Sequence, residues 1–322
     1  MVAGLVATAA GSARAELAVT VVDEGVRLRR ASGGEPPATR SPELSAMREE
    51  TVAFQLAVES DAPARVRAEV TVAPPLVGRL FVQHFVEVTA RSRNDRHPDH
   101  ALPFSAAARP PDADYLGEIA EALVPTGRAP RWLYPSEIDP STRAAFWVDV
   151  FVPPEAPPGE YAGMVNLVDE IAGRAHAVAF TVRVQPQRLP YRAARAFAYY
   201  ERRTLEKVFS RPDDVEREVV TELHAHGLDA ITQVTSVADL ARLRGSYDGS
   251  WFRPESGYVG PGVGVATDLL PLGAYGTLGD PSDASLARIA ELARAAPQGA
   301  DPLFVYAIDE TCDSPRGPIF RR

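Results

Sequence analysis

Residues 51–58 read Thr51-Val52-Ala53-Phe54-Gln55-Leu56-Ala57-Val58, and this stretch decides the fold class of the first half of the chain. Its larger apolar side chains stand at every second position, at Val52, Phe54, Leu56 and Val58. Successive side chains of a strand point to opposite faces of its sheet, so these four share one face. The period of two therefore predicts a β-strand with one buried face.

Similar segments continue on both sides of this stretch, from Leu17 to about Gln187. They are short and apolar, they are separated by proline and glycine, and they show little helical periodicity, which is typical of all-β domains. The candidate strands are Leu17–Val22, Thr51–Glu59, Arg65–Val72, Arg79–Thr89, Ala145–Val152, Gly159–Leu167 and Ala175–Val184. Two packed antiparallel sheets bury such strands economically, so we expect a β-sandwich domain over residues 16–188.

One long segment, residues 94–140, interrupts the strand pattern with many prolines. We expect a loop there, with Trp132 and Tyr134 exposed, and such a loop either borders a functional cleft or is a solvated connection. His97, Asp99 and His100 carry metal-binding side chains, but they lack a further partner, so the sequence predicts no metal site.

The composition changes after Pro186 and Pro190, where strand-like and helix-like patterns begin to alternate. Alternation of this kind is typical of parallel α/β architectures. The expected strands are Arg195–Tyr200, Leu228–Val234, Val263–Thr267 and Leu303–Ile308, and the expected helices are Asp213–His226, Val237–Arg244 and Ser282–Ala296. A complete (β/α)8 TIM-type barrel needs about 200–250 residues and about 130 remain, so residues 189–322 are predicted to form about four βα units, the N-terminal half of a barrel truncated at its C-terminus.

The composition of the 322 residues limits the partners. A formal charge of −9 disfavours nucleic acid and anionic membranes, both of which attract clustered positive charge. No apolar run reaches the roughly 18 residues that a membrane span requires. The single cysteine, Cys312, excludes an intrachain disulfide and a multi-cysteine zinc site, and no cofactor is predicted.

Residues 1–15 contain an apolar run, Val2–Ala10, followed by Ala13-Arg14-Ala15. This order resembles the apolar core and the small-residue cleavage site of a secretory signal, although the basic first part is missing. We expect a partial signal peptide and a secreted or periplasmic protein. The alternative is an ordinary N-terminal segment.

An acidic pair, Asp309-Glu310, follows the predicted strand that ends at Ile308. Glycoside hydrolysis commonly uses two carboxyl groups beside the scissile bond, and catalytic groups of (β/α) barrels stand at the carboxyl ends of strands. The pair is therefore a candidate catalytic pair. A solvated acidic turn is the alternative that the spacing leaves open.

Four short motifs occur in order along the chain: Glu160-Tyr161-Ala162-Gly163, Leu189-Pro190, His226-Gly227-Leu228-Asp229 and Tyr306-Ala307-Ile308-Asp309-Glu310. Together they resemble glycoside hydrolase family 123 and its relative, the domain of unknown function numbered 4091. The resemblance implies retaining, substrate-assisted hydrolysis of N-acetylhexosamine glycans, in which Asp309 orients the 2-acetamido group and Glu310 protonates the leaving oxygen. Proline usually follows the pair in that family, whereas Thr311 follows it here.

Further candidates for the sugar site are polar or aromatic residues after predicted strands and in loops. Those predicted to bind substrate are Tyr199, Tyr200, Glu201, Trp251 and Tyr306, and each aromatic ring can equally be core packing. His224 and His226 are predicted to be surface or cap residues, because two positions apart they do not share a helix face. The leading prediction is a hexosaminidase-like glycoside hydrolase acting on a carbohydrate. The alternatives are a non-catalytic carbohydrate- or cell-surface-binding sandwich with a remnant barrel, and a partial chain with no autonomous function.

Overall fold

The computed structural model describes residues 16–32, 42–89, 116–192, 194–273, 282–297 and 303–305. The chain forms two compact units, Met1–Arg188 and Leu189–Arg322.

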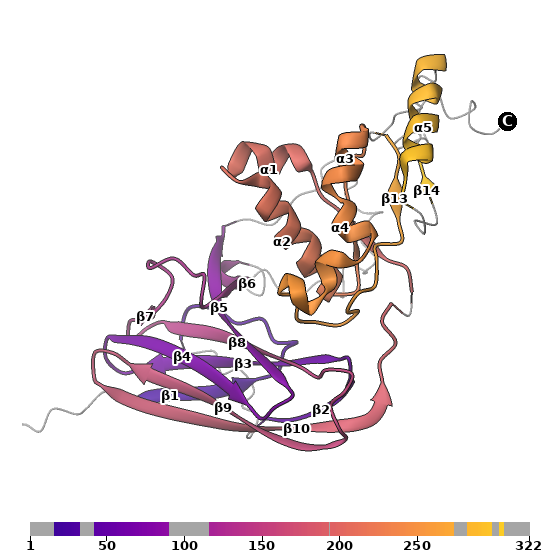
Figure 1. Cartoon of the computed structure of the whole chain (residues 1–322). Coiled ribbons are helices and arrows are strands. Elements are labelled where there is room, and N and C mark those ends of the chain that lie inside the picture. Colours follow the sequence, from indigo (N-terminus) through magenta and orange to yellow (C-terminus); the bar gives the residue numbers. More distant parts are fainter. Residues whose placement is uncertain are drawn as a thin grey trace, which may run out of the picture. The chain divides into compact units, whose positions relative to one another are not determined.

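The first unit contains two five-stranded sheets (Figure 1). In the first sheet every neighbouring pair is antiparallel, and the order is β1 (Leu17–Val22), β3 (Thr51–Ser60), β8 (Arg143–Phe151), β5 (Val77–Val88) and β6 (Gly117–Pro125). The order in the second sheet is β2 (Glu43–Arg48), β10 (Arg174–Arg188), β9 (Gly159–Asp169), β4 (Ala64–Val72) and β7 (Ser136–Ile138). Only β2 and β10 pair in parallel within this second sheet.

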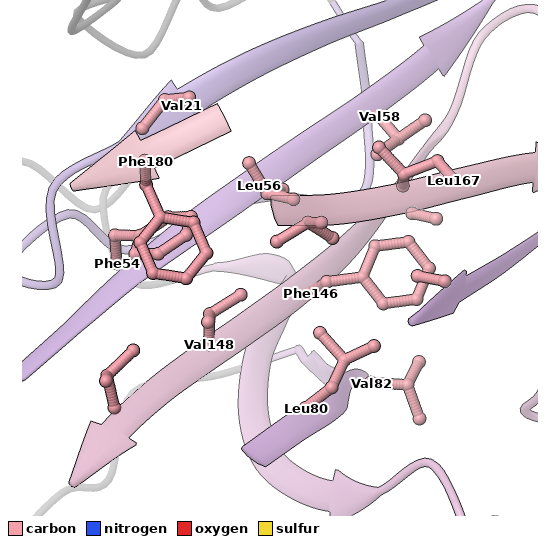
Figure 2. Packing of buried hydrophobic residues seen from close by; sticks show 14 of the residues in the cluster. Val21, Phe54, Leu56, Val58, Leu80, Val82, Phe146, Val148, Leu167 and Phe180 are labelled. Carbon is pink, nitrogen blue, oxygen red and sulfur yellow. The ribbon is translucent and has the colours of Figure 1, made fainter. Parts of the chain in front are cut away.

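The two sheets share one hydrophobic core, part of which Figure 2 shows. Phe54, Leu56 and Val58 of β3 face this core, as their period of two predicts. Phe180 of β10 packs beside Phe54, with ring centroids 5.2 Å apart. A Cβ atom on Gly163 would lie only 2.1 Å from the Phe180 ring, so this motif position requires glycine for packing.

The other face of the first sheet carries the residues between these core positions. Gln55 and Ala57 of β3 lie on this face, where the segment Asp23–Ala31 covers part of the sheet. Backbone bridges join Arg29 to Ile119 and Ala31 to Thr142. Leu28, Ala57 and Phe85 are among the residues of a small second core beneath the segment. The face is therefore partly enclosed by the chain itself.

Two predictions for residues 94–140 are wrong within the described residues. The strands β6 and β7 fall inside the predicted loop, and Tyr134 is buried. Its hydroxyl accepts a hydrogen bond from Ala68 N at 2.9 Å and donates one to Ala68 O at 2.8 Å, so polar contacts on β4 hold this aromatic ring inside. Trp132 is exposed, as predicted. His97, Asp99 and His100 lie outside the described residues.

The second unit contains short helices and shorter strands. In chain order these are β11 (Phe197–Tyr199), α1 (Arg202–Val208), α2 (Pro212–Ala225), β12 (Asp229–Ile231), α3 (Val237–Arg242), α4 (Arg244–Tyr247), η3 (Ser250–Phe252), η4 (Pro254–Ser256), β13 (Leu270–Pro271), α5 (Asp283–Ala295) and β14 (Leu303–Phe304).

The predicted fold class, with its incomplete (β/α)8 barrel, is wrong. β11 pairs in parallel with β12, and β13 pairs in parallel with β14, as two separate two-stranded sheets. The predicted strand Val263–Thr267 is irregular, because Gly262 and Gly264 have φ angles of +71° and +73°, which an extended ladder does not accept. In the described residues, most of the regular secondary structure is antiparallel β-sheet, and helices are few. Helices lie between the paired strands in the chain, but the two pairs do not join into the predicted barrel sheet.

Candidate functional site

The candidate site lies at the carboxyl end of β11, where three predicted residues are consecutive. Tyr199 ends the strand, and its hydroxyl donates a hydrogen bond to Glu201 Oε1 at 3.1 Å. The Tyr199 side chain is 40% exposed, so its ring and the Glu201 carboxylate are accessible together. Partial burial raises the pKa of Tyr199; a hydrogen bond with Gln233 lowers it, and the Glu201 carboxylate raises it further, so the phenol is protonated at neutral pH.

Tyr200 points instead into a polar network. Its backbone N–H donates to Ile231 O at 3.0 Å and extends the pairing with β12, while its hydroxyl donates to Glu216 Oε1 at 2.8 Å. Burial and the negative charge of Glu216 raise the pKa of Tyr200 well above its ordinary value. Tyr200 is therefore a neutral phenol that anchors the strand end.

Glu216 of α2 is the centre of this network and is 1% exposed. Its carboxylate accepts hydrogen bonds from Arg202 Nη1 at 2.9 Å and from Arg242 Nη1. Burial alone lowers the pKa of Arg242, but the hydrogen bonds to Glu216 and Asp239 raise it above the ordinary value. Since an unpaired buried charge is strongly destabilising, the three charges hold α2, α3 and the start of α1 to the end of β11.

A second buried group contains His224, which the sequence prediction wrongly placed at the surface. His224 is 1% exposed, and its ring stacks on Phe252 with centroids 3.5 Å apart. Its Nε2 lies 2.9 Å from Gly262 O and donates to it, because a carbonyl oxygen only accepts. Its Nδ1 accepts from Arg192 Nη2 at 3.3 Å. Burial lowers the pKa of His224 to about 4, so the ring is neutral at pH 7.

Arg192 joins two of the sequence motifs in space. Its Nη2 lies 2.7 Å from Asp229 Oδ1, and the side chains are 6% and 1% exposed. Asp229 ends the His226–Asp229 motif, while Arg192 follows Leu189-Pro190 and has a left-handed φ of 58°. Tyr191 adds a hydrogen bond from its hydroxyl to His224 O at 2.7 Å. The motif residue Asp229 therefore serves a structural contact, with the residues that follow Leu189-Pro190, and the strain at Arg192 is offset by this ion pair.

Trp251, also predicted to bind sugar, is part of the packing. Its partly buried indole contacts two hydrophobic clusters, one around Leu243 and Tyr247 and one around Val220 and Phe252. A Cβ atom on Gly245 would lie 2.0 Å from Trp251 Nε1, so the helix α4 accommodates the indole only with glycine there.

The buried network was missed by sequence reasoning, which singled out neither Glu216 nor its arginine partners. A signal was present: Glu216, Val220 and His224 are four residues apart and form one stripe of the helix. All three are buried, so the apolar residue in the middle marks the face on which the two polar residues lie.

The predicted catalytic residues Asp309 and Glu310, together with Tyr306, lie outside the described residues. Within the described ranges no group of three or more His, Cys, Asp or Glu side chains is placed to hold a metal ion. The helices of that same part of the chain include none long and apolar enough to cross a membrane.

No protein-family model matches the chain, and no curated protein matches it. Among solved structures, the chain is similar to a family 123 glycoside hydrolase from Clostridium perfringens, studied for glycolipid glycan hydrolysis, with 10% identity and a TM-score of 0.45 over 67% of this chain and 37% of that one. It is also similar to a putative membrane anchored protein from Corynebacterium diphtheriae, with 10% identity and a TM-score of 0.26 over 57% of this chain and 38% of that one.

The chain thus spans about a third of the length of each of these two proteins. TM-scores below 0.5 at this identity support no transfer of function, so the family assignment stays a prediction from the four motifs.

Proposed function

We propose that this protein acts on N-acetylhexosamine-containing glycans as a glycoside hydrolase. The observation that carries the proposal from the structure is the accessible Tyr199–Glu201 pair at the carboxyl end of β11. An aromatic ring offers an apolar face to the C–H groups of a pyranose, and a carboxylate accepts hydrogen bonds from its hydroxyl groups. The pair is therefore suited to hold a sugar ring.

The buried side of the same strand end supports this role. Tyr200 and Arg202, which flank Glu201, are both bonded to the buried carboxylate of Glu216. A recognition group functions best when neighbouring residues fix its position before the ligand arrives. The Glu216 network supplies that fixed position.

The proposed chemistry rests on the sequence resemblance. Asp309 orients the 2-acetamido group of the substrate, whose oxygen attacks the anomeric carbon, and Glu310 protonates the departing glycosidic oxygen. Water then opens the cyclic intermediate with net retention of configuration. The apolar run near the N-terminus supports a proposed secreted or periplasmic location, where such glycans occur.

The test is hydrolysis of methyl N-acetylhexosaminides of both anomers, whose poor leaving group needs protonation, by the parent chain and by two variants. Glu310→Gln and Asp309→Asn are each expected to lower kcat about 100-fold or more, since a positioned acid or base contributes roughly that factor. Glu255→Gln, an exposed substitution in η4, is the matched control and leaves the rate unchanged. No hydrolysis by the parent chain, or equal rates for parent and Glu310→Gln, would overturn the proposal.

A further inference from the structure

A cavity of about 260 Å³ opens on the outer face of the first sheet, within the first unit. Three sources line it: the segment of residues 24–28, the strand β6, and single side chains from β3, β5 and β8. These single side chains are Gln55, Gln83 and Trp147. Pockets for drug-sized ligands measure about 300–1,000 Å³, so this cavity suits a smaller molecule.

The wall of the cavity is fixed without a ligand. Gln55 is 2% exposed, and its Nε2 donates to Asp23 O and to Val26 O, both at 2.8 Å. Val26 N also donates to Asp23 O at 3.1 Å. One buried amide therefore ties residues 23–26 to β3 and keeps the space between them open.

The same bonds settle the orientation of Gln83, which is 5% exposed. Because the Gln55 amide nitrogen faces two carbonyl oxygens, its Oε1 faces Gln83 and accepts from Gln83 Nε2 at 2.8 Å. Gln83 Nε2 also contacts Phe146 O at 3.4 Å. Gln83 Oε1 receives no hydrogen bond from any residue that the structure describes. The acceptor oxygen of this largely buried side chain is thus available to a ligand hydroxyl on the cavity wall.

Trp147 and the charged rim define the kind of ligand. The indole N–H already donates to Asp149 Oδ1 at 2.6 Å, so the ring offers apolar surface to the cavity. Arg27 and Glu121, 3.8 Å apart, place both signs of charge at the rim with about half of each side chain exposed. Glu24 adds a further negative charge. Anions would be repelled, and a purely apolar ligand would leave Gln83 unpaired.

We propose that this cavity binds one neutral sugar residue, with a hydroxyl donating to Gln83 Oε1 and a ring face against Trp147. Apolar C–H groups and hydroxyl groups alternate around such a ring, which matches an aromatic side chain beside an amide and a mixed-charge rim. This binding site belongs to the first unit and does not depend on the proposed hydrolysis. It would hold glycan to the protein independently of the catalytic residues.

The test is calorimetric titration of the complete chain, carrying Glu310→Gln to prevent turnover, with free glucose, galactose, mannose, N-acetylglucosamine and N-acetylgalactosamine. At least one of these sugars is expected to bind saturably. Gln83→Leu and Trp147→Ala are each expected to weaken that binding about tenfold or more. Trp132→Ala is the matched control, because this tryptophan is 72% exposed, lies in the same unit and does not line the cavity.

Thermal unfolding of each variant separates lost binding from lost folding. If Gln83→Leu fails to fold, Glu121→Gln on the exposed rim is expected to weaken binding about threefold without changing the unfolding temperature. The proposal is overturned if none of the five sugars binds, or if binding survives both cavity substitutions. If the parent chain hydrolyses hexosaminides but the cavity variants bind sugar as tightly as the parent, the binding site is excluded. The proposed function is unaffected by that result.

Discussion

The two units bury their interiors in different ways. In the first, one continuous apolar core joins both sheets and includes Phe54, Phe146 and Phe180. The first unit also buries charged side chains, such as Arg143 and Asp169, outside that core. In the second, two smaller apolar clusters accompany networks of buried charges, namely Glu216 with its arginines and Asp229 with Arg192. Apolar packing is insensitive to pH, whereas buried ionisable groups couple folding to protonation. Changes of side-chain volume are therefore expected to lower the free energy of unfolding most in the first unit. Changes of side-chain charge are expected to lower it most in the second.

The largest expected effect tests the packing side of this contrast. Phe146 is 0% exposed, and Phe146→Ala is expected to lower the free energy of unfolding by about 3–5 kcal/mol through lost transfer energy and a residual cavity. Urea unfolding followed by near-ultraviolet circular dichroism measures it. Ile171→Ala, in the same unit and 65% exposed, should stay within about 0.5 kcal/mol of the parent. Equal losses for both would remove the distinction between core and surface.

The charge side of the contrast is tested by Glu216→Gln. This nearly isosteric change leaves Arg202 and Arg242 without their shared buried counter-charge and is expected to destabilise the second unit by about 3 kcal/mol. Glu218→Gln, on the exposed side of the same helix, is the matched control and should have little effect. Hydrogen exchange resolved along the chain assigns the loss to a unit. Faster exchange confined to the first unit would contradict the role given to this network.

The pH dependence sharpens the contrast further. The pKa of His224 is lowered to about 4 in the fold, from 6.5 in the unfolded chain. Between these values the unfolded chain binds the extra proton, so the contribution of His224 is complete above pH 6.5 and is lost as the pH falls towards 4. The loss is up to about 3 kcal/mol, at about 1.36 kcal/mol for each pH unit.

Stability of the second unit should therefore decrease between pH 6.5 and pH 4, and His224→Gln should flatten that slope. His226→Gln, 64% exposed at its side chain, should leave the slope as in the parent. Denaturant unfolding at several pH values measures both. An unchanged slope in His224→Gln would show that other groups govern the acid response.

The smallest expected effect concerns one glycine of the sandwich. Gly163→Ala places a Cβ atom against the Phe180 ring and is expected to cost about 2 kcal/mol through overpacking. Gly127→Ala has open space around the new atom and is the control, expected to be neutral or slightly stabilising. A neutral Gly163→Ala would indicate that the core between β9 and β10 yields more easily than its packing implies. The unfolding temperature is sufficient for this comparison.

The sequence could predict the sandwich strands because burial there follows a period of two, as at Phe54, Leu56 and Val58. It could not predict the pairing in the second unit, because strand and helix patterns are local, whereas sheet extent depends on contacts between distant segments. A further error has a local cause. The left-handed backbone at Gly262 and Gly264 makes the apolar run Val263-Gly264-Val265 a loop, where a strand was predicted.

The sequence found one part of the candidate site and missed another. It placed Tyr200 and Glu201 at a strand end, with Tyr199 among the aromatic candidates, whereas the structure pairs Glu201 with Tyr199. It missed the long-range partners of Tyr200 and His224, because side-chain contacts across the fold, such as Tyr200 with Glu216, leave only a weak four-residue stripe in the sequence. The polar cavity around Gln83 was missed for the same reason, since Gln55 and Gln83 are separated by 28 positions.

The most direct test of glycoside hydrolysis is the leaving-group dependence of Glu310→Gln. An acid that protonates the departing oxygen matters greatly for a poor leaving group such as methanol and little for 2,4-dinitrophenol, which departs without protonation. The ratio of kcat/KM between parent and Glu310→Gln is therefore expected to be about 100-fold or more for the methyl N-acetylhexosaminide and close to one for the dinitrophenyl compound. The same ratio for both substrates, or no hydrolysis of either by the parent chain, would contradict the assignment of Glu310 as the acid.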